Sequence, residues 1–207
     1  MKRFLMMATA ALVCSQAATA QNLLANPSFE DGFNGWTNFN NSFIEPIFAV
    51  DGTNTMKAFG TFGGFSFSGA FQDFPAASGD VFSGSVFVGH LSSDPLEPWT
   101  PDPSVANAAI MSIQFFDAGN NQLLNNEFRI LDSSSPTDIM FFEQRTSDPA
   151  PAGTAYVRYV LGVLQGDNSA GDFPAGAAYF DAATFVPTPG ALGLFGVAGL
   201  AMARRRR

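Results

Sequence analysis

Histidine and cysteine are almost absent from this 207-residue chain, which holds one of each, His90 and Cys14. One cysteine cannot form an intrachain disulfide. A catalytic site needs a base, a nucleophile or an open metal site, and no motif around His90 supports a nucleophile–histidine arrangement. Paired-carboxylate glycosidase chemistry needs only two acids, but nothing in the sequence favours it. We therefore expect a protein that is not an enzyme.

Basic side chains are also scarce, and six of the ten lie at the ends of the chain, at Lys2, Arg3 and Arg204–Arg207. Between residues 22 and 186 only four remain against all 18 acidic side chains, which gives that segment a formal charge of −14 (18 acidic minus 4 basic). Nucleic-acid binders neutralise phosphates with Lys and Arg. This charge balance excludes nucleic acid as a partner.

Residues 1–20 have the three parts of a secretory signal peptide: the basic start Lys2–Arg3, the apolar stretch Phe4–Cys14 and the small residues Ala18–Ala20. Signal peptidase is therefore an expected partner, and cleavage after Ala20 leaves a mature chain without cysteine. A lipoprotein anchor at Cys14 is not expected, because Val13 stands where lipoprotein processing needs a small residue.

The other end has a Pro-containing motif, Val186–Gly190 (VPTPG), then the apolar segment Ala191–Ala203, then Arg204–Arg207. Thirteen residues rise about 20 Å as a helix, which is short of the roughly 30 Å hydrocarbon core of a membrane. As a lone transmembrane anchor the segment is marginal. The arginines favour a cytoplasmic C-terminus, with residues 21–186 outside.

This order of motif, helix and arginine cluster resembles the PEP-CTERM sorting signal of exported proteins in Gram-negative bacteria. The resemblance implies that residues 187–207 are read by an exosortase, a membrane-embedded cysteine protease, and that the protein ends in the cell envelope, at the surface or in the extracellular matrix. It departs at Thr188, where the commonest form of the motif has Glu. The residues of the signal would be Val186, Pro187, Thr188, Pro189, Gly190, Arg204, Arg205, Arg206 and Arg207.

The body between these ends, residues 21–186, has the pattern of an all-β domain. The chain has 46% apolar residues, 23 Phe, and 33 Gly plus Pro, which suits a packed core of short strands joined by turns. Apolar and polar residues alternate in several runs, so one face of each strand is buried and the other solvated. We expect a jelly-roll β-sandwich. The predicted strands are Phe65–Phe74, Val81–Gly89, Ala108–Asp117, Ile139–Arg145, Tyr156–Gln165 and Ala177–Phe185, with weaker ones at Trp36–Asn40, Phe43–Val50 and Met56–Phe59.

Three segments carry a second resemblance: NLLANPSFEDGFNGW from Asn22, APAGTAYVRYVLGVL from Ala150 and GAAYFDAATF from Gly176. They resemble the galactose-binding-like jelly rolls, in particular the carbohydrate-binding modules of families 4 and 9. The sequence departs from that pattern in the long insertion His90–Ser104 and at Ala182, where many relatives carry a second acid.

Two acids, Glu30 and Asp181, are candidate metal ligands, because the first and last strands of a jelly roll lie close together. In relatives with this pattern such a pair holds a structural Ca²⁺ together with backbone carbonyls, which the turn Asp51–Asn54 could supply here. The alternative is that both acids are solvated or hydrogen-bonded residues at strand ends.

The two tryptophans have different predicted roles. Trp99 lies in the Pro-rich insertion, where an exposed indole would stack on a sugar ring, unless it folds back over the edge of the sandwich. Trp36 is expected in the core. Together these features predict an exported protein that binds polysaccharide of the envelope or matrix without catalysis. The alternative is a structural surface or biofilm-matrix protein with no defined sugar ligand.

Overall fold

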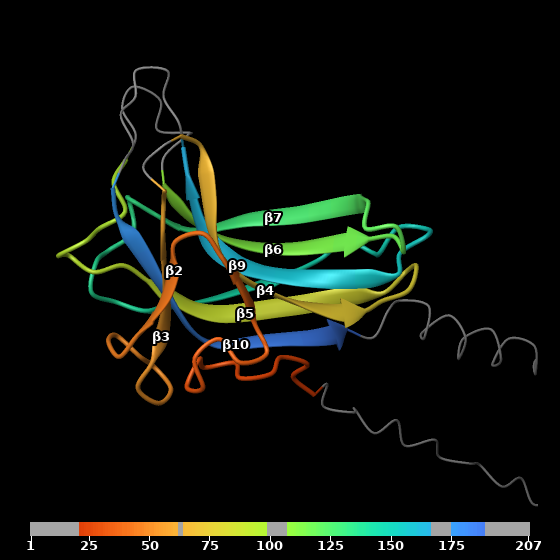
Figure 1. Ribbon diagram of the computed structural model, residues 1–207, viewed down its shortest axis with the longest axis horizontal. Coiled ribbons are helices and arrows are strands. Elements are labelled where there is room, and N and C mark those ends of the chain that lie inside the picture. The colour runs from red at the N-terminus through yellow and green to blue at the C-terminus, as the bar shows by residue number, and fades with distance from the viewer. Residues whose placement is uncertain (1–20, 62–63, 99–106, 167–174, 189–207) are drawn as a thin grey trace, which may run out of the picture.

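The computed structural model describes residues 21–61, 64–98, 107–166 and 175–188, which form two five-stranded antiparallel sheets (Figure 1). The predicted all-β jelly-roll sandwich is confirmed. Sheet A contains, in spatial order, β1 (Thr37–Phe39), β4 (Ser66–Pro75), β9 (Tyr156–Gln165), β6 (Ala108–Phe116) and β7 (Gln122–Asp132). Sheet B contains β2 (Ser42–Glu45), β3 (Thr55–Phe59), β10 (Ala177–Thr188), β5 (Val81–Gly89) and β8 (Phe141–Thr146).

The core lies between the sheets and follows from the alternation of side chains along each strand. In β9, Val157, Tyr159 and Leu161 face inward and are fully buried. The ring of Tyr159 stacks on Phe185 of sheet B at 4.9 Å, and its hydroxyl donates a hydrogen bond to the Ser85 carbonyl at 3.1 Å. These contacts join the two sheets at the centre of the sandwich.

Trp36 is buried, as predicted, with 6% of its surface exposed. Its ring lies 4.9 Å from that of Phe29 and 6.5 Å from that of Tyr159. The indole N–H donates to the Asn26 carbonyl at 3.0 Å, so its polar atom is satisfied inside the core.

The N-terminal segment runs along the last strand, which closes the sandwich. Leu23 N–H donates to the Phe185 carbonyl at 2.8 Å, and Ala183 N–H donates to the Pro27 carbonyl at 2.9 Å. Strand β10 is irregular between Asp181 and Thr184, with Ala182 at a positive φ of 46°. The segment that precedes the first strand thus lies beside the last strand, whereas the first strand itself, β1, pairs with β4 in sheet A.

Strand β10 is longer than the sequence predicted. It continues through Val186 to Thr188, with Pro187 opposite Phe82 and Thr188 opposite Val81. The Thr188 hydroxyl donates to the Val81 carbonyl at 2.9 Å. The first residues of the Pro-containing motif thus belong to the sandwich.

No described residue is part of a helix long and apolar enough to cross a membrane. The predicted signal peptide, residues 1–20, and the predicted apolar helix, Ala191–Ala203, lie outside the described residues, as do Pro189, Gly190 and the arginine cluster.

Candidate functional sites

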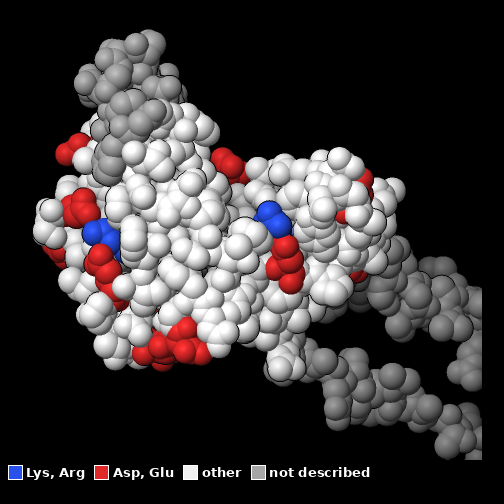
Figure 2. Space-filling model, viewed as in Figure 1, with Lys and Arg blue, Asp and Glu red and all other residues white. Residues whose placement is uncertain are grey.

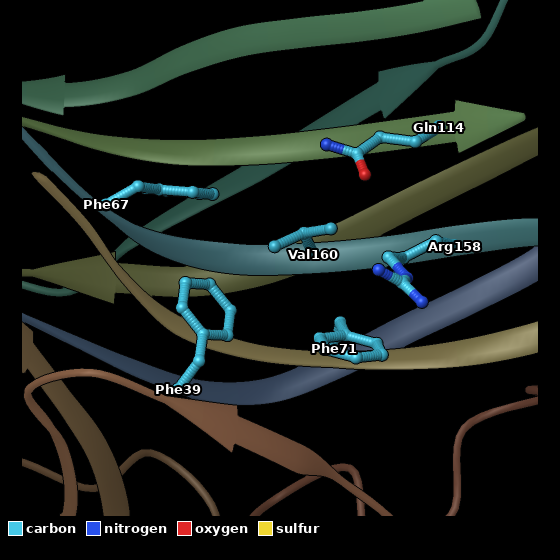
Figure 3. Close-up of a pocket in the computed structure, with 6 residues that line it drawn as sticks. All are labelled: Phe39, Phe67, Phe71, Gln114, Arg158 and Val160. Carbon is cyan, nitrogen blue, oxygen red and sulfur yellow. The ribbon is translucent and has the colours of Figure 1, made fainter. Parts of the chain in front are cut away.

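The outward face of sheet A carries an open depression of about 230 Å³ (Figure 3). Register pairs place four of its lining residues side by side on three neighbouring strands: Phe71 of β4 pairs with Val160 of β9, and Arg158 of β9 pairs with Gln114 of β6. The remaining rings come from β1 and from the start of β4. The lining residues are Phe39, Phe67, Phe71, Gln114, Arg158 and Val160.

The aromatic part of the depression is a cluster of three rings. The centroid of Phe39 lies 5.5 Å from that of Phe67 and 6.2 Å from that of Phe71. Gly69 pairs with both Phe39 and Gly162, so the floor between the rings has no side chains. A Cβ at Gly69 would lie 2.1 Å from the Leu161 carbonyl oxygen, so the close approach of β4 and β9 requires glycine.

The polar part of the depression is centred on Arg158. Its Nε and Nη2 donate to the two carboxylate oxygens of Asp73, at 2.7 and 2.9 Å. The guanidinium carbon lies 3.8 Å from the centroid of Phe71 and 5.1 Å from that of Phe116. The hydrogen bonds that Arg158 donates to Asp73 raise the pKa of Arg158. Arg158 is therefore a fixed, planar group beside the amide of Gln114.

This arrangement has the chemistry of a binding surface. Phenylalanine rings offer flat apolar area, while guanidinium and amide groups offer hydrogen-bond donors and an acceptor. The depression, at about 230 Å³, is smaller than the roughly 300–1,000 Å³ of typical small-molecule pockets. Its size fits an open groove on the surface. We call this set of six residues the sheet A groove.

The two predicted metal ligands lie at one loop, residues 50–54. Asp181 is fully buried, and its Oδ2 accepts hydrogen bonds from the backbone N–H of Val50 and Asp51 at 2.6 and 2.8 Å. Its Oδ1 accepts from Ala182 N–H at 2.6 Å. Burial raises the pKa of Asp181, and the charge of Asp51 adds to this, while the three N–H groups oppose it.

Glu30 holds the other half of the same loop. Its Oε1 accepts from the N–H groups of Thr53 and Asn54 at 2.8 and 2.6 Å. Gly52 has a φ of 77°, and a Cβ there would lie 2.3 Å from the Glu30 carboxyl carbon. Glycine is thus required both by the backbone conformation and by the carboxylate that packs on it.

The fit of this region to calcium follows from its donor set. Both carboxylates are present as predicted, but in the hydrogen bonds described above the loop offers them N–H groups and not carbonyl oxygens. Within the described residues no group of three or more His, Cys, Asp or Glu side chains is arranged to hold a metal ion. Calcium at Glu30 and Asp181 remains a prediction, and binding would require carboxylate oxygens to exchange N–H contacts for the cation.

Two other residues singled out from the sequence are Trp99 and His90, of which the structure describes only His90. Trp99 lies outside the described residues. His90 is buried, with its Nδ1 accepting from Leu96 N–H at 3.0 Å, so its Nε2 carries the proton toward the Ser135 carbonyl at 2.9 Å. Both ring nitrogens are used in holding the loop after β5, which gives His90 a structural role.

The sheet A groove was missed by the sequence reasoning, which treated phenylalanine as the aromatic of interiors. The signal was present in β4, where Phe67, Gly69, Phe71 and Asp73 alternate with the inward residues of the strand. Assigning these rings to one surface with Arg158 required the pairing of β4 with β9, which the sequence does not contain.

Comparison with known proteins identifies the fold and no family. No protein-family model matches the chain, and no curated protein sequence matches it significantly. Among solved structures, the chain resembles a family 16 carbohydrate-binding module, with TM-score 0.52 and 19% identity over 80% of this chain and 99% of that one. It also resembles a family 61 module in complex with β-1,4-galactotriose, with TM-score 0.50 and 12% identity over 82% of this chain and 100% of that one.

A third similar structure is the enzymatically active domain of tailspike protein 4 from bacteriophage CBA120, with TM-score 0.54 and 12% identity. The match covers 81% of this chain but only 21% of the tailspike chain. At these identities the likeness extends to the fold alone. The fold is that of jelly-roll carbohydrate-binding modules.

Proposed function

We propose that this protein is an exported, non-catalytic polysaccharide-binding protein whose ligand lies in the sheet A groove. The observation that carries the proposal is the convergence of three phenylalanine rings with Arg158 and Gln114 on one outward face. The apolar faces of sugar rings pack on aromatic side chains, and their hydroxyl groups hydrogen-bond to fixed polar groups. The likeness to two carbohydrate-binding modules supports the same class of ligand.

Export and sorting form the second half of the proposal, and the two ends of the sequence support it. The signal peptide would direct residues 21–188 out of the cytoplasm, and the motif, apolar segment and arginines from Val186 to Arg207 would be read by an exosortase. A polysaccharide-binding domain delivered in this way would attach the protein to envelope or matrix polysaccharide.

The test is binding of the purified protein to β-1,4-galacto-oligosaccharides and xylo-oligosaccharides, followed by a wider glycan array. Phe71→Ala removes the ring beneath Arg158, and we expect an affinity about 5- to 150-fold weaker, taking as a guide the about 1–3 kcal/mol of an aromatic side chain stacked on a nucleobase. Arg158→Lys keeps the charge but loses the two-pronged contact with Asp73, and should also weaken binding.

Phe142→Ala is the matched control, because Phe142 is an exposed phenylalanine of β8, on the opposite sheet, with 54% of its surface accessible. Its affinity should equal that of the unmodified protein. If Phe71→Ala and Phe142→Ala bound alike, the groove would not be the binding site. If no glycan bound at all, the alternative of a structural matrix protein without a sugar ligand would be favoured.

A further inference from the structure

The outward face of sheet B carries a second aromatic and ionic cluster, at the end where β2 and β3 pair. Phe43 of β2 and Phe59 of β3 have rings 5.7 Å apart and inclined by 16°, and Phe43 is 49% exposed. Lys57 pairs in register with both Phe43 and Tyr179, so the three side chains share this face. Its Nζ lies 5.7 Å from the centroid of Phe59 and 5.5 Å from that of Tyr179.

Two carboxylates surround the ammonium group of Lys57. Asp94 Oδ2 lies 3.3 Å and Glu45 Oε1 lies 3.7 Å from Nζ. Burial alone would lower the pKa of Lys57, but the hydrogen bonds to Tyr179 and Asp94 and the charge of Glu45 outweigh it, so the pKa is raised and the group stays charged. The cluster therefore carries one positive and two negative charges.

A hollow of about 140 Å³ opens beside this cluster, lined by Lys57, Phe59, Asp94, Ala175 and Gly176. Its wall is fixed by backbone hydrogen bonds: Ala177 N–H donates to the Asp94 carbonyl at 3.3 Å, and Glu97 N–H donates to the Ala175 carbonyl at 3.0 Å. A Cβ at Gly176 would lie 2.0 Å from the Pro95 carbonyl oxygen, so the two segments approach as closely as glycine allows.

The chemistry of the cluster selects one kind of ligand. Its net negative charge disfavours anions, and the ammonium group inside it disfavours a metal ion. A purely apolar ligand would bury the carboxylates and the ammonium group without replacing their contacts with water, at a cost in free energy. A neutral polyhydroxyl compound with an apolar face satisfies both parts, through stacking on Phe43 and hydrogen bonds to Lys57 and Asp94.

We propose that this cluster is a second saccharide-binding site, specific for neutral sugars, on the sheet opposite the sheet A groove. The inference rests on the proposed function for the class of ligand, but on different residues. With one site on each face of the sandwich, a single molecule bridges two polysaccharide chains. The protein would then crosslink a matrix, and binding at the second site would add to the avidity that the first site provides.

The experiment uses the purified protein with Phe43→Ala, Phe71→Ala and the double variant, and Phe142→Ala as control. Thermal unfolding first establishes that each variant is folded; Phe43 and Phe142 are about half exposed, so their loss should not unfold the chain. Titration with β-1,4-galacto- and xylo-oligosaccharides gives the number of sites. Aggregation of beads coated with galactan or xylan measures bridging.

We expect two sites in the unmodified protein, one in each single variant and none in the double variant. Each single variant should still bind beads but lose bridging at least tenfold, while Phe142→Ala bridges normally. Asp94→Asn, which removes an acceptor but no ring, should weaken the second site alone.

Other results separate the two proposals. If Phe43→Ala retained the stoichiometry and bridging of the unmodified protein, the second site would be refuted and the groove would stand. If Phe43→Ala abolished all binding and Phe71→Ala had no effect, the second site would stand and the groove would be refuted. Absence of any binding to either oligosaccharide series would overturn both.

Discussion

Asp181 offers a sharp test of how the sandwich is closed, because one buried carboxylate holds the backbone of the 50–54 loop against the last strand. In Asp181→Asn the amide keeps one oxygen in place of two. If that oxygen takes the position of Oδ2, the bonds from Val50 and Asp51 remain, and the new NH₂ group faces the N–H of Ala182. The N–H of Ala182 then faces a donor and has no acceptor, and a hydrogen-bonding group left unsatisfied in this way costs about 1–3 kcal/mol.

We therefore expect Asp181→Asn to lower the free energy of unfolding by about 2 kcal/mol at pH 7, and Asp181→Ala to lower it further, because all three N–H groups then lose their acceptor. For a domain of this size about 2 kcal/mol corresponds to a fall in Tm of roughly 4–8 °C. Urea unfolding followed by circular dichroism measures both quantities.

Asp51→Asn is the control, because it removes a negative charge from the same loop and keeps an oxygen acceptor for the Ser28 hydroxyl, which donates to Asp51 at 2.6 Å. It should not lower the free energy of unfolding, because the acceptor for Ser28 is kept and the charge that repels the Asp181 carboxylate is removed. An Asp181→Asn protein with the same midpoint as the unmodified one would refute the idea that this carboxylate holds the loop.

The pH dependence gives an independent check. Because the pKa of Asp181 is raised in the folded protein, the folded state binds the proton more tightly than the unfolded chain does. The contribution of this group to stability is therefore largest below the unfolded pKa, about 4, falls as the pH rises through the folded pKa, and is constant above it. The difference in stability between the unmodified protein and Asp181→Asn should follow that course, and a difference independent of pH would contradict the raised pKa.

Further predictions concern the C-terminal end of the chain and the metal. Residues 21–188 should fold alone, whereas a chain ending at residue 186 should lose the hydrogen bond between Thr188 and Val81 and about 2–4 °C in Tm. Deleting only residues 189–207 should release the folded protein from the envelope. Unchanged retention in the envelope would refute the sorting signal. If Glu30 and Asp181 bind Ca²⁺, a hundredfold excess over Kd should stabilise the protein by about 2.7 kcal/mol relative to chelator, and equal midpoints would refute the site.

The sequence predicted the strands in which apolar residues recur at inward-facing positions along the whole strand. Val81–Gly89 and Tyr156–Gln165 were predicted with the bounds that the structure has, because apolar residues alternate through their full length. The strand Gln122–Asp132 is not among the predicted strands. It is one of the two edge strands of sheet A, and Asn125 and Asn126 interrupt its apolar pattern.

The candidate sites were predictable to the extent that they depend on local pattern. The position of Glu30 and Asp181 near one another followed from the closure of a jelly roll, and both contact the same loop. Their partners did not follow, because the sequence does not say whether a turn presents N–H or carbonyl groups. The groove depends on register, since Phe39, Phe71 and Arg158 come from three strands far apart in the chain.

The distribution of charge restricts the ligand further. Every basic side chain in the body lies near an acid: Lys57 with Glu45 and Asp94, Arg145 with Glu143, Arg158 with Asp73, and Arg129 with Asp132. The pKa of Asp132 is lowered first by its hydrogen bonds with Ser134 and also by the charge of Arg129. The basic patches visible in Figure 2 each touch acidic ones. An acidic polysaccharide would therefore meet a body of charge −14 without an uncompensated cation to receive its carboxylates. If the two proposed sites bind polysaccharide, a neutral one is therefore the class that needs no ion pair to be displaced.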